Sequence, residues 1–247
     1  MLHGGPGSAH DALEALSALI DQGRRVVFYD QLGSGESDRP DDPSLWTVET
    51  FIEQLRSVRE GLGLDEIHLF GSSWGGMLAV EYALTRPEGL ASLVLNSTPS
   101  SAPRWAEETA RLAAGLDGEE FRRRHICRLD PEPDVLQRAR AKFGKQVYET
   151  MWGPNEFTVT GTLKDWDVIG RLGEIRVPTL ITSGRYDECT PTLVEPLHRG
   201  IAGSEWVLFE DSAHMPYLEE PERYLQVVRE FLERLEVRPE AGLEGSG

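Results

Sequence analysis

One stretch of the chain, residues 68–84, joins a strand pattern to a helix pattern through a serine that has glycines on both sides. It reads HLFGSSWGGMLAVEYAL, so an apolar run of strand type leads into Gly71-Ser72-Ser73-Trp74-Gly75 and then into an apolar helix. A G-x-S-x-G sequence in this context is typical of a sharp, strained turn that lifts the serine above the edge of a sheet. The flanking glycines let neighbouring backbone approach without a clash at Cβ. The stretch therefore predicts an α/β fold with Ser73 presented at the sheet edge.

The rest of the chain has the alternation of strands and helices that such a fold needs. The β-rich runs are nearly continuous in apolar residues, as in parallel strands covered on both faces; they span residues 24–30, 67–71, 91–96, 177–184 and 205–210. Helical patterns lie between or after these runs, at residues 11–22 before Gly23, at 47–62 after a Thr47 cap, and around 224–235. This order predicts a doubly wound, mostly parallel sheet.

Residues 97–176 break the alternation, because they contain helical and charged segments but no convincing strand. An insertion that leaves the sheet after one strand and returns at the next should cover the carboxyl edge of the sheet, where open α/β proteins bind their ligands. We therefore predict a core of residues 1–97 and 177–237, a helical cap of residues 98–176, and a disordered tail of residues 238–247.

Composition argues against several classes of function. The 247 residues carry a formal charge of -17, which disfavours nucleic acid and anionic membranes as partners. No apolar run approaches the length of a membrane span, and the N-terminus does not resemble a secretory signal. Two cysteines cannot form a disulfide framework, so we expect a cytoplasmic location. We expect no metal and no cofactor, since the sequence has neither a H-E-x-x-H motif nor a nucleotide-binding fingerprint.

A serine hydroxyl is a weak nucleophile that needs a histidine base, and the base needs an acid to orient it. In sheets of this kind the acid and the histidine follow the serine in that order. Asp187 follows the fourth β-rich run and His214 follows the fifth, at the edge where Ser73 is expected. Glu210 and Asp211 are alternatives to Asp187, but they lie at the wrong end of a strand. We predict Ser73 as nucleophile, His214 as base and Asp187 as the orienting acid.

Attack by Ser73 creates an oxyanion, which needs hydrogen-bond donors. One predicted donor is the backbone N–H of Trp74, the residue after the nucleophile. The other is Gly5, in the early glycine-rich loop His3-Gly4-Gly5-Pro6-Gly7, where bare backbone can face a substrate carbonyl. A plain tight turn is the alternative interpretation of that loop. We expect His3 to make a hydrogen bond within the loop rather than to perform chemistry.

Several motifs taken together resemble one family. They are HGGPG, YDQLGSGESDRP at 29–40, GSSWGG, YETMWGPNEFTVTG at 148–161, GRYDECTP and SAHMPYLEEP. This combination, spread from residue 3 to about residue 235, resembles the proline iminopeptidases of the α/β-hydrolase superfamily. GSSWGG alone is shared with many hydrolases, whereas HGGPG combined with DQxGxGxS and GPNEF is much more specific.

The resemblance implies a serine hydrolase that releases an N-terminal residue, preferentially proline, from short peptides with a free N-terminus. It implies the same triad and assigns Glu156 and Glu188 to the free amino group of the substrate, with Tyr148 assisting. A protonated amine that leaves water needs carboxylates nearby, and an N-acylated peptide would leave those carboxylates unpaired. An ordinary glutamate on the surface of the cap remains the alternative for Glu156.

The sequence departs from the family in two ways. Only Met1 and Leu2 precede His3, so we expect the N-terminal strands of the sheet to be missing, and the cap is shorter than expected. A shorter cap keeps open a broader esterase or amino-acid amidase with the same triad. The missing strands keep open an inactive, truncated protein with the hydrolase fold.

Overall fold

The computed structural model describes residues 1–20 and 24–236, and within them the sheet has four strands. They are β1 (Ile67–Ser72), β2 (Leu90–Asn96), β3 (Thr179–Gly184) and β4 (Glu205–Phe209), arranged in that spatial order. Each neighbouring pair is parallel, and the register runs from Phe70 through Val94 to Leu180. The predicted parallel sheet is therefore confirmed in four of its five runs.

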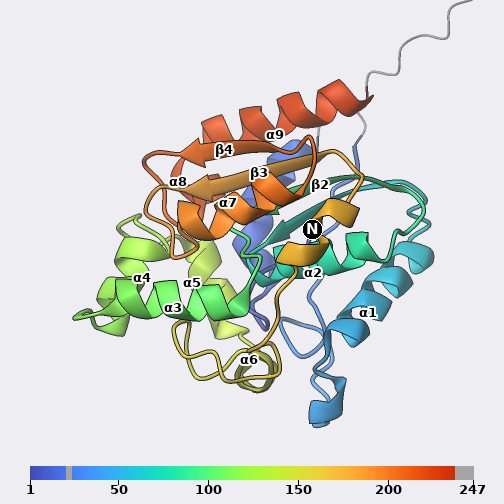
Figure 1. The fold of residues 1–247 in the computed structure, drawn as a ribbon. Helices are drawn as coiled ribbons and strands as arrows, with labels where there is room; N and C mark the ends of the chain where they lie inside the picture. Colours follow the sequence, from blue (N-terminus) through green and yellow to red (C-terminus); the bar gives the residue numbers. More distant parts are fainter. Residues whose placement is uncertain (21–23, 237–247) are drawn as a thin grey trace, which may run out of the picture.

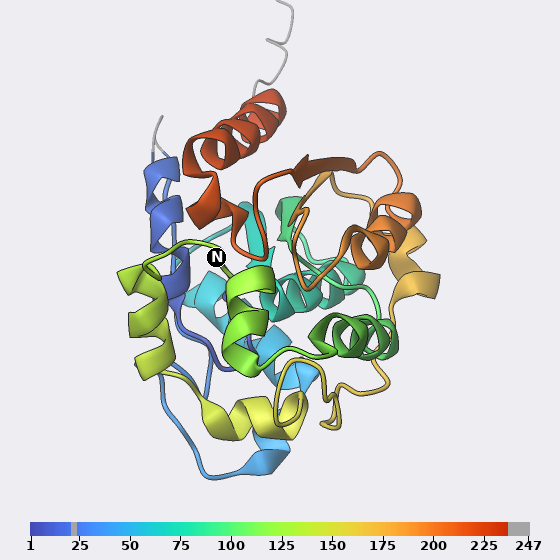
Figure 2. The ribbon, with the colours of Figure 1, turned by 90° about the vertical axis from the view of Figure 1, so that its left-hand side faces the viewer.

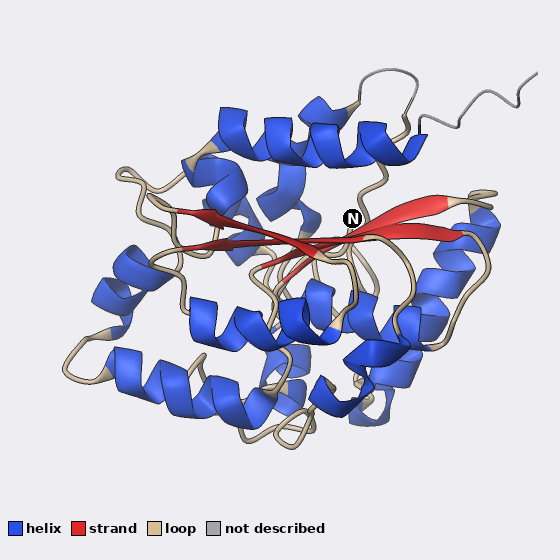
Figure 3. Ribbon diagram, turned by 45° about the horizontal axis from the view of Figure 1, so that its top comes forward, coloured by secondary structure: helices blue, strands red, loops and turns tan. Residues whose placement is uncertain are grey.

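Helices cover both faces of the sheet, as the edge-on view in Figure 3 shows. One face packs against η1 (His10–Leu19) and α9 (Pro221–Glu236). The other packs against α1 (Val48–Gly61), α2 (Trp74–Leu84) and α7 (Pro191–Gly200). The short helices η2 (Pro43–Leu45) and α8 (Pro216–Glu219) lie in the connecting segments.

Two apolar clusters, one on each face, follow from the alternation of side chains along a strand. The cluster under η1 and α9 includes one residue from each of β1, β2 and β3, namely Phe70, Val94 and Leu180. The cluster under α1, α2 and α7 contains residues next to them in the chain: Leu69, Leu93 and Ile181. Because both faces are covered by helices, these strands are mostly apolar, which is why they were recognisable in the sequence. None of the helices in the described ranges is long and apolar enough to cross a membrane.

The chain between β2 and β3 contains no named strand, as the sequence predicted. It forms α3 (Ala102–Ala113), α4 (Gly118–His125), α5 (Asp134–Ala141), α6 (Lys145–Met151) and η3 (Ile169–Glu174). In Figure 1, α3 and α4 lie on the side of the molecule to which the arrows of β3 and β4 point. In Figure 2, α5 lies alongside η1. There the buried carboxylate of Asp11 binds Arg138 at 3.2 Å and Lys142 at 3.1 Å, which fastens α5 to the sheet-covering helices. The division into core and cap stays a prediction.

The prediction of a strand at residues 24–30 was wrong, because these residues belong to no strand. A strand forms only where a neighbouring chain can take up its backbone hydrogen bonds. On the edge of β1 away from β2, Leu2 is the one described residue that pairs with the strand, and its N–H donates to the Phe70 carbonyl at 2.8 Å. The amino group of Met1 donates to the Val27 carbonyl at 2.9 Å, and no ladder continues from there.

Helix positions were predicted more closely than this strand. The pattern after Thr47 is confirmed as α1, with the Thr47 hydroxyl capping the N–H of Thr50. The pattern at 11–22 is a 3-10 helix that ends at Leu19. Its predicted end at Gly23 and the predicted tail at 238–247 lie outside the described residues.

Candidate active site

Ser73 occupies a strained turn between β1 and α2. Its backbone has φ 55° and ψ -120°, a region that residues with a side chain rarely adopt. Hydrogen bonds on both sides of the residue hold it there. Its N–H donates to the Asn96 carbonyl at 2.9 Å, and its own carbonyl accepts from Gly76 at 2.8 Å and Met77 at 3.0 Å. Ser73 is therefore fixed by the end of β2 and by the first turn of α2.

The glycines around Ser73 are required by the close approach of other backbone. A Cβ on Gly71 would lie 2.2 Å from the Gly75 carbonyl oxygen, and a Cβ on Gly75 would lie 2.2 Å from the Leu2 carbonyl oxygen. A Cβ on Gly4 would lie 3.3 Å from the Ser73 Cβ, so the HGGPG loop passes directly over the serine. The glycines of the G-x-S-x-G pattern are therefore needed because the end of β1, the start of α2 and the chain around Leu2 pack closely together at this turn.

His214 and Asp187 form a buried hydrogen-bonded pair. The His214 Nδ1 and Asp187 Oδ1 atoms are 2.6 Å apart, and Oδ1 also accepts from the Cys189 N–H at 2.8 Å. A carboxylate can only accept, so Nδ1 carries the proton and Nε2 is left with a lone pair. The sequence placed these residues after two different strands, and the structure brings them together. Their arrangement gives His214 the orientation and tautomer of a general base.

Asn96, at the end of β2, connects the serine turn to the histidine loop. Its carbonyl accepts from Ser73, and its side-chain Nδ2 approaches the His214 carbonyl at 3.4 Å. Ser97 donates its hydroxyl to the same His214 carbonyl at 3.1 Å. The Ser73 hydroxyl makes no hydrogen bond to His214 within the described residues, and such pairs are often looser before substrate binds. Sequence reasoning missed Asn96; its signal was a polar residue that ends an apolar run at the carboxyl edge.

The charge around His214 favours its protonated form. Burial opposes protonation, but the charge of Asp187, its hydrogen bond, and the charges of Glu156 and Glu219 together raise the pKa of His214 above its usual value. The ring also packs edge-on against Trp105 of α3, with centroids 6.3 Å apart. A base that gains a proton during attack is thus stabilised as an imidazolium by the groups around it.

The HGGPG loop is organised around His3 and Gln31. The Gln31 N–H donates to His3 Nε2 at 3.0 Å, so Nδ1 carries the proton and donates to the Gly4 carbonyl at 2.9 Å, as predicted for a loop-stabilising histidine. The side chain of Gln31 binds the His3 carbonyl and accepts from the Trp74 indole at 2.8 Å. Gln31 lies in the DQxGxGxS motif, whose spacing alone did not indicate this role.

Within the described residues, the two predicted oxyanion donors make no hydrogen bond to another part of the protein. In the described residues, neither the Trp74 N–H, at the start of α2, nor the Gly5 N–H donates to an acceptor. Gly5 has φ 114°, and a Cβ there would lie 2.4 Å from the Gly7 nitrogen, so the loop conformation depends on glycine. These N–H groups keep their capacity to bind a negatively charged oxygen.

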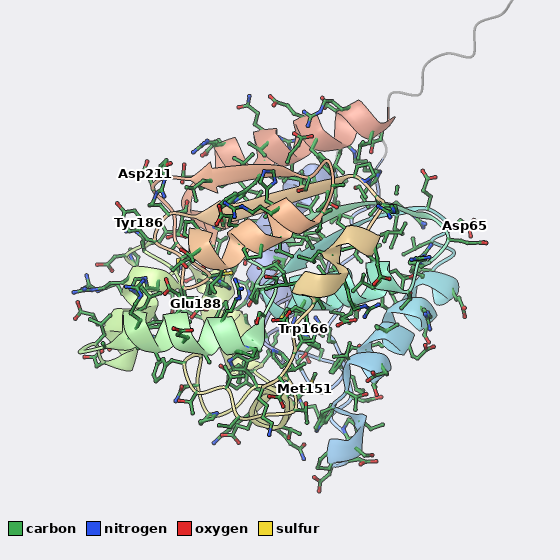
Figure 4. All side chains as sticks on the ribbon, in the orientation of Figure 1. Asp65, Met151, Trp166, Tyr186, Glu188 and Asp211 are labelled. Carbon is green, nitrogen blue, oxygen red and sulfur yellow. The ribbon has the colours of Figure 1, made fainter. Side chains whose placement is uncertain are left out.

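Three more predicted residues lie near the pair. The Tyr148 hydroxyl donates to Glu156 Oε1 at 2.7 Å, and the Glu156 carbonyl accepts from the Trp105 indole at 2.8 Å. Glu188 Oε1 lies 3.9 Å from His214 Nδ1. Figure 4 shows Tyr186 at the edge of the molecule, whereas Glu188, two residues further along, lies inside it.

Glu188 is buried and Glu156 is partly buried, and this placement carries an electrostatic cost. Burial raises the pKa of Glu188 well above its usual value, and the charges of Glu156 and Asp187 raise it further. Burial also raises the pKa of Glu156, against the hydrogen bond from Tyr148 and the charge of His214. Among the described residues, Glu188 Oε2 and Asp187 Oδ2 are buried without a hydrogen-bond partner. A cation entering this region would relieve that cost.

Comparison with known proteins agrees with this geometry. The model of the alpha/beta hydrolase fold family matches residues 1–221. A proline iminopeptidase from Clostridium botulinum is 41% identical over 261 residues, covering 95% of this chain and 89% of the relative. The chain belongs to the proline iminopeptidase family. It is a proline iminopeptidase-like serine aminopeptidase, as the motifs predicted.

Two further relatives support the family membership. A proline iminopeptidase from Lactobacillus acidophilus is 42% identical over 261 residues, covering 94% of this chain and 89% of the relative. The crystal structure of a proline iminopeptidase from Mycobacterium smegmatis superposes with a TM-score of 0.90 at 36% identity, covering 95% of this chain and 88% of that one.

The packing at the serine turn predicts a large effect of one methyl group. Gly75→Ala would place Cβ against the Leu2 carbonyl, so we expect it to lower the free energy of unfolding by about 1–3 kcal/mol or more. Gly118→Ala is the matched control, because a Cβ at that helix start meets nothing within 4 Å. Urea denaturation of both variants measures the difference. Equal stabilities for the two would contradict the tight crossing of backbone at the turn.

The environment of His214 predicts a loss of activity in acid. Only the neutral imidazole can accept the serine proton, so the rate should fall as the pH drops through the pKa of His214. Since that pKa is raised, the half-point should lie above the ordinary histidine value of about 6.5. The measurement is kcat/KM against pH, with samples returned to neutral pH to check that activity recovers. A rate that stays constant down to about pH 5 would exclude His214 as the base.

Proposed function

We propose that this enzyme releases N-terminal residues, preferentially proline, from short peptides by means of Ser73, His214 and Asp187. The observation that carries the proposal is the pair of carboxyl groups beside the His214–Asp187 pair, of which Glu188 is buried and Glu156 is partly buried. A hydrolase for neutral esters has no use for buried acids that burial makes costly to ionise. A substrate with a protonated amine gives them a partner.

The reaction begins with acyl transfer to the serine. The Ser73 hydroxyl oxygen attacks the carbonyl carbon of the first residue while His214 Nε2 takes up the hydroxyl proton. Asp187 accepts the Nδ1 proton in a hydrogen bond and stabilises the imidazolium that forms. His214 then donates its proton to the leaving amine, and the C–N bond breaks. Water, deprotonated by His214, cleaves the acyl-enzyme and restores Ser73.

The oxyanion of each tetrahedral intermediate is assigned to the backbone N–H groups of Trp74 and Gly5. Support comes from their position at the serine turn and in the loop over it, and from their lack of other acceptors in the described residues. The N-terminus of α2 adds its positive dipole end beside the same oxygen. Such donors lower the barrier because they are already oriented when the charge develops.

Selection of the N-terminal residue is assigned to Glu156, Glu188 and Tyr148. The Tyr148 hydroxyl holds one oxygen of Glu156, which leaves the other oxygen for an ammonium group. An ammonium beside two carboxylates gains charge-assisted hydrogen bonds, whereas an acylated amine leaves them buried without a counter-charge. The preference for proline follows from the relatives, which are named proline iminopeptidases.

The first test compares three substrates: a proline anilide, its N-acetylated form and a simple acyl ester. We expect turnover of the free-amine anilide alone, with Ser73→Ala as the blank for each substrate, because acetylation removes the cation that the carboxylates bind. Steady-state release of the aniline or alcohol is the measurement. Comparable turnover of the ester and the acetylated anilide would point instead to a broader esterase or amidase, and no turnover above the blank to an inactive protein.

A second test removes the carboxyl charges one at a time. Glu156→Gln and Glu188→Gln should each lower kcat/KM for the proline anilide about 30-fold or more, the effect of breaking a buried charge pair. Glu149→Gln is the control, since this exposed residue lies on α6 next to Tyr148 and, in the part of the chain that the structure describes, pairs with Lys145 alone. Labelling of Ser73 by a serine-directed phosphonate should be unchanged in all three variants. Loss of labelling in the two site variants would mean that the substitutions damage the triad rather than amine binding.

A further inference from the structure

The loop that carries His214 is fixed through three consecutive backbone N–H groups. The N–H of Ala213 donates to Glu219 Oε2 at 2.9 Å, and the N–H of Met215 donates to the same oxygen at 3.2 Å. Between them, the His214 N–H donates to the Ile126 carbonyl at 3.1 Å. One carboxylate oxygen therefore binds the residues on either side of His214.

The second oxygen of Glu219 reaches a different part of the chain. Oε1 accepts from the Arg128 N–H at 2.8 Å, just beyond the end of α4. Ile126, which binds His214 directly, belongs to the same turn after α4. Glu219 comes from α8, so this single side chain joins the histidine loop, α8 and the segment after α4. Hydrogen bonds from N–H groups to an ionised carboxylate are stronger than those to a neutral acceptor.

The charge of Glu219 also belongs to the group of acids around His214. Asp187 and Glu188 face the imidazole from the loop after β3, Glu156 from the loop after α6, and Glu219 from α8. The guanidinium of Arg128 is directed elsewhere, over the ring of Tyr186 at 3.7 Å. Burial lowers the pKa of His214, and Glu219 is one of the charges that raise it again.

We propose that Glu219 is a positioning residue for the reaction, holding the His214 loop in register with the serine turn and with the segment after α4. The inference rests on the proposed function only in taking His214 as the base. A residue in this role acts through two effects. It fixes the backbone from which the imidazole projects, and it contributes negative charge that stabilises the imidazolium.

Glu220 provides a matched control on the same helix end. Its Oε2 accepts from the Ser212 hydroxyl at 2.6 Å and from the Asp211 N–H at 3.2 Å, so it also supports this loop. It binds neither neighbour of His214, and its charge is not among those that raise the pKa of His214. A merely structural role in the loop should therefore be shared by both glutamates, whereas positioning of the base should be specific to Glu219.

The experiment compares Glu219→Gln with Glu220→Gln. We expect Glu219→Gln to lower kcat for the proline anilide about 10- to 100-fold with little change in KM, since a displacement of about 1 Å in a catalytic group can cost about 100-fold in rate. The acid half-point of its kcat/KM profile should move to lower pH, because a negative charge near His214 is lost. Glu220→Gln should keep both the rate and the half-point. An unchanged rate and half-point in Glu219→Gln, or equal changes in both variants, would overturn the proposal.

Two additional measurements separate the effect of Glu219 on His214 from poor recognition of the substrate and from a failure of the variant to fold. The rate of Ser73 labelling by a serine-directed phosphonate depends on His214 but not on recognition of proline, so it should fall in Glu219→Gln even if the proline anilide proves to be a poor substrate. If Glu219→Gln does not fold, Glu219→Asp replaces it. This variant keeps the charge but pulls the carboxylate back by one methylene, so the labelling rate should fall while the half-point stays close to wild type. A wild-type labelling rate in Glu219→Asp would overturn the proposal.

Discussion

The strained turn at Ser73 is the constraint on which the site depends. Its positive φ persists because the end of β2 and the first turn of α2 bind the residue from both sides. The same corner leaves no room for a Cβ on Gly71 or Gly75, so β1, α2 and the chain around Leu2 meet there in van der Waals contact. Strain of this kind costs about 1–3 kcal/mol and survives only where the surrounding packing overdetermines it. Here that packing is the parallel sheet itself, and the position of the hydroxyl is a direct product of the fold.

A second constraint is electrostatic. Asp187, Glu188 and Glu156 gather around one imidazole, and burial makes the ionised form of each additional carboxylate costly. The raised pKa values of Glu156 and Glu188 express that cost, while the raised pKa of His214 expresses the attraction of the same charges for a proton. Both effects arise from the same group of carboxylates around His214. In the proposed function, a substrate ammonium would neutralise the acids when it binds, and it would therefore also weaken their pull on the proton that His214 gives to the leaving group.

Much of this arrangement could be predicted from local sequence. The serine turn was recognisable because its glycines are needed within five successive residues, and Asp187 and His214 because each follows an apolar run that ends at the same edge. The prediction for residues 24–30 failed for a physical reason. Their pattern fits a strand, but a strand needs a paired neighbour, and among the described residues Leu2 alone pairs with the edge of β1 away from β2. Asn96, Gln31 and Glu219 were missed because each acts through hydrogen bonds to backbone, and each has at least one partner far away in the chain. No local pattern encodes such a partner.

The segment after α4 shows why the predicted boundary between core and cap does not divide the chemistry. The Ile126 carbonyl binds the N–H of His214, and the His125 carbonyl binds the N–H of Glu188 at 3.1 Å. The His125 ring in turn contacts the Tyr186 carbonyl at 2.8 Å. The loops that carry His214, Asp187 and Glu188 are thus each tied to one turn of the insertion. Movement of that turn would displace His214 and Glu188 together, so the insertion is a structural part of the candidate site rather than a cover over a site that the sheet completes alone.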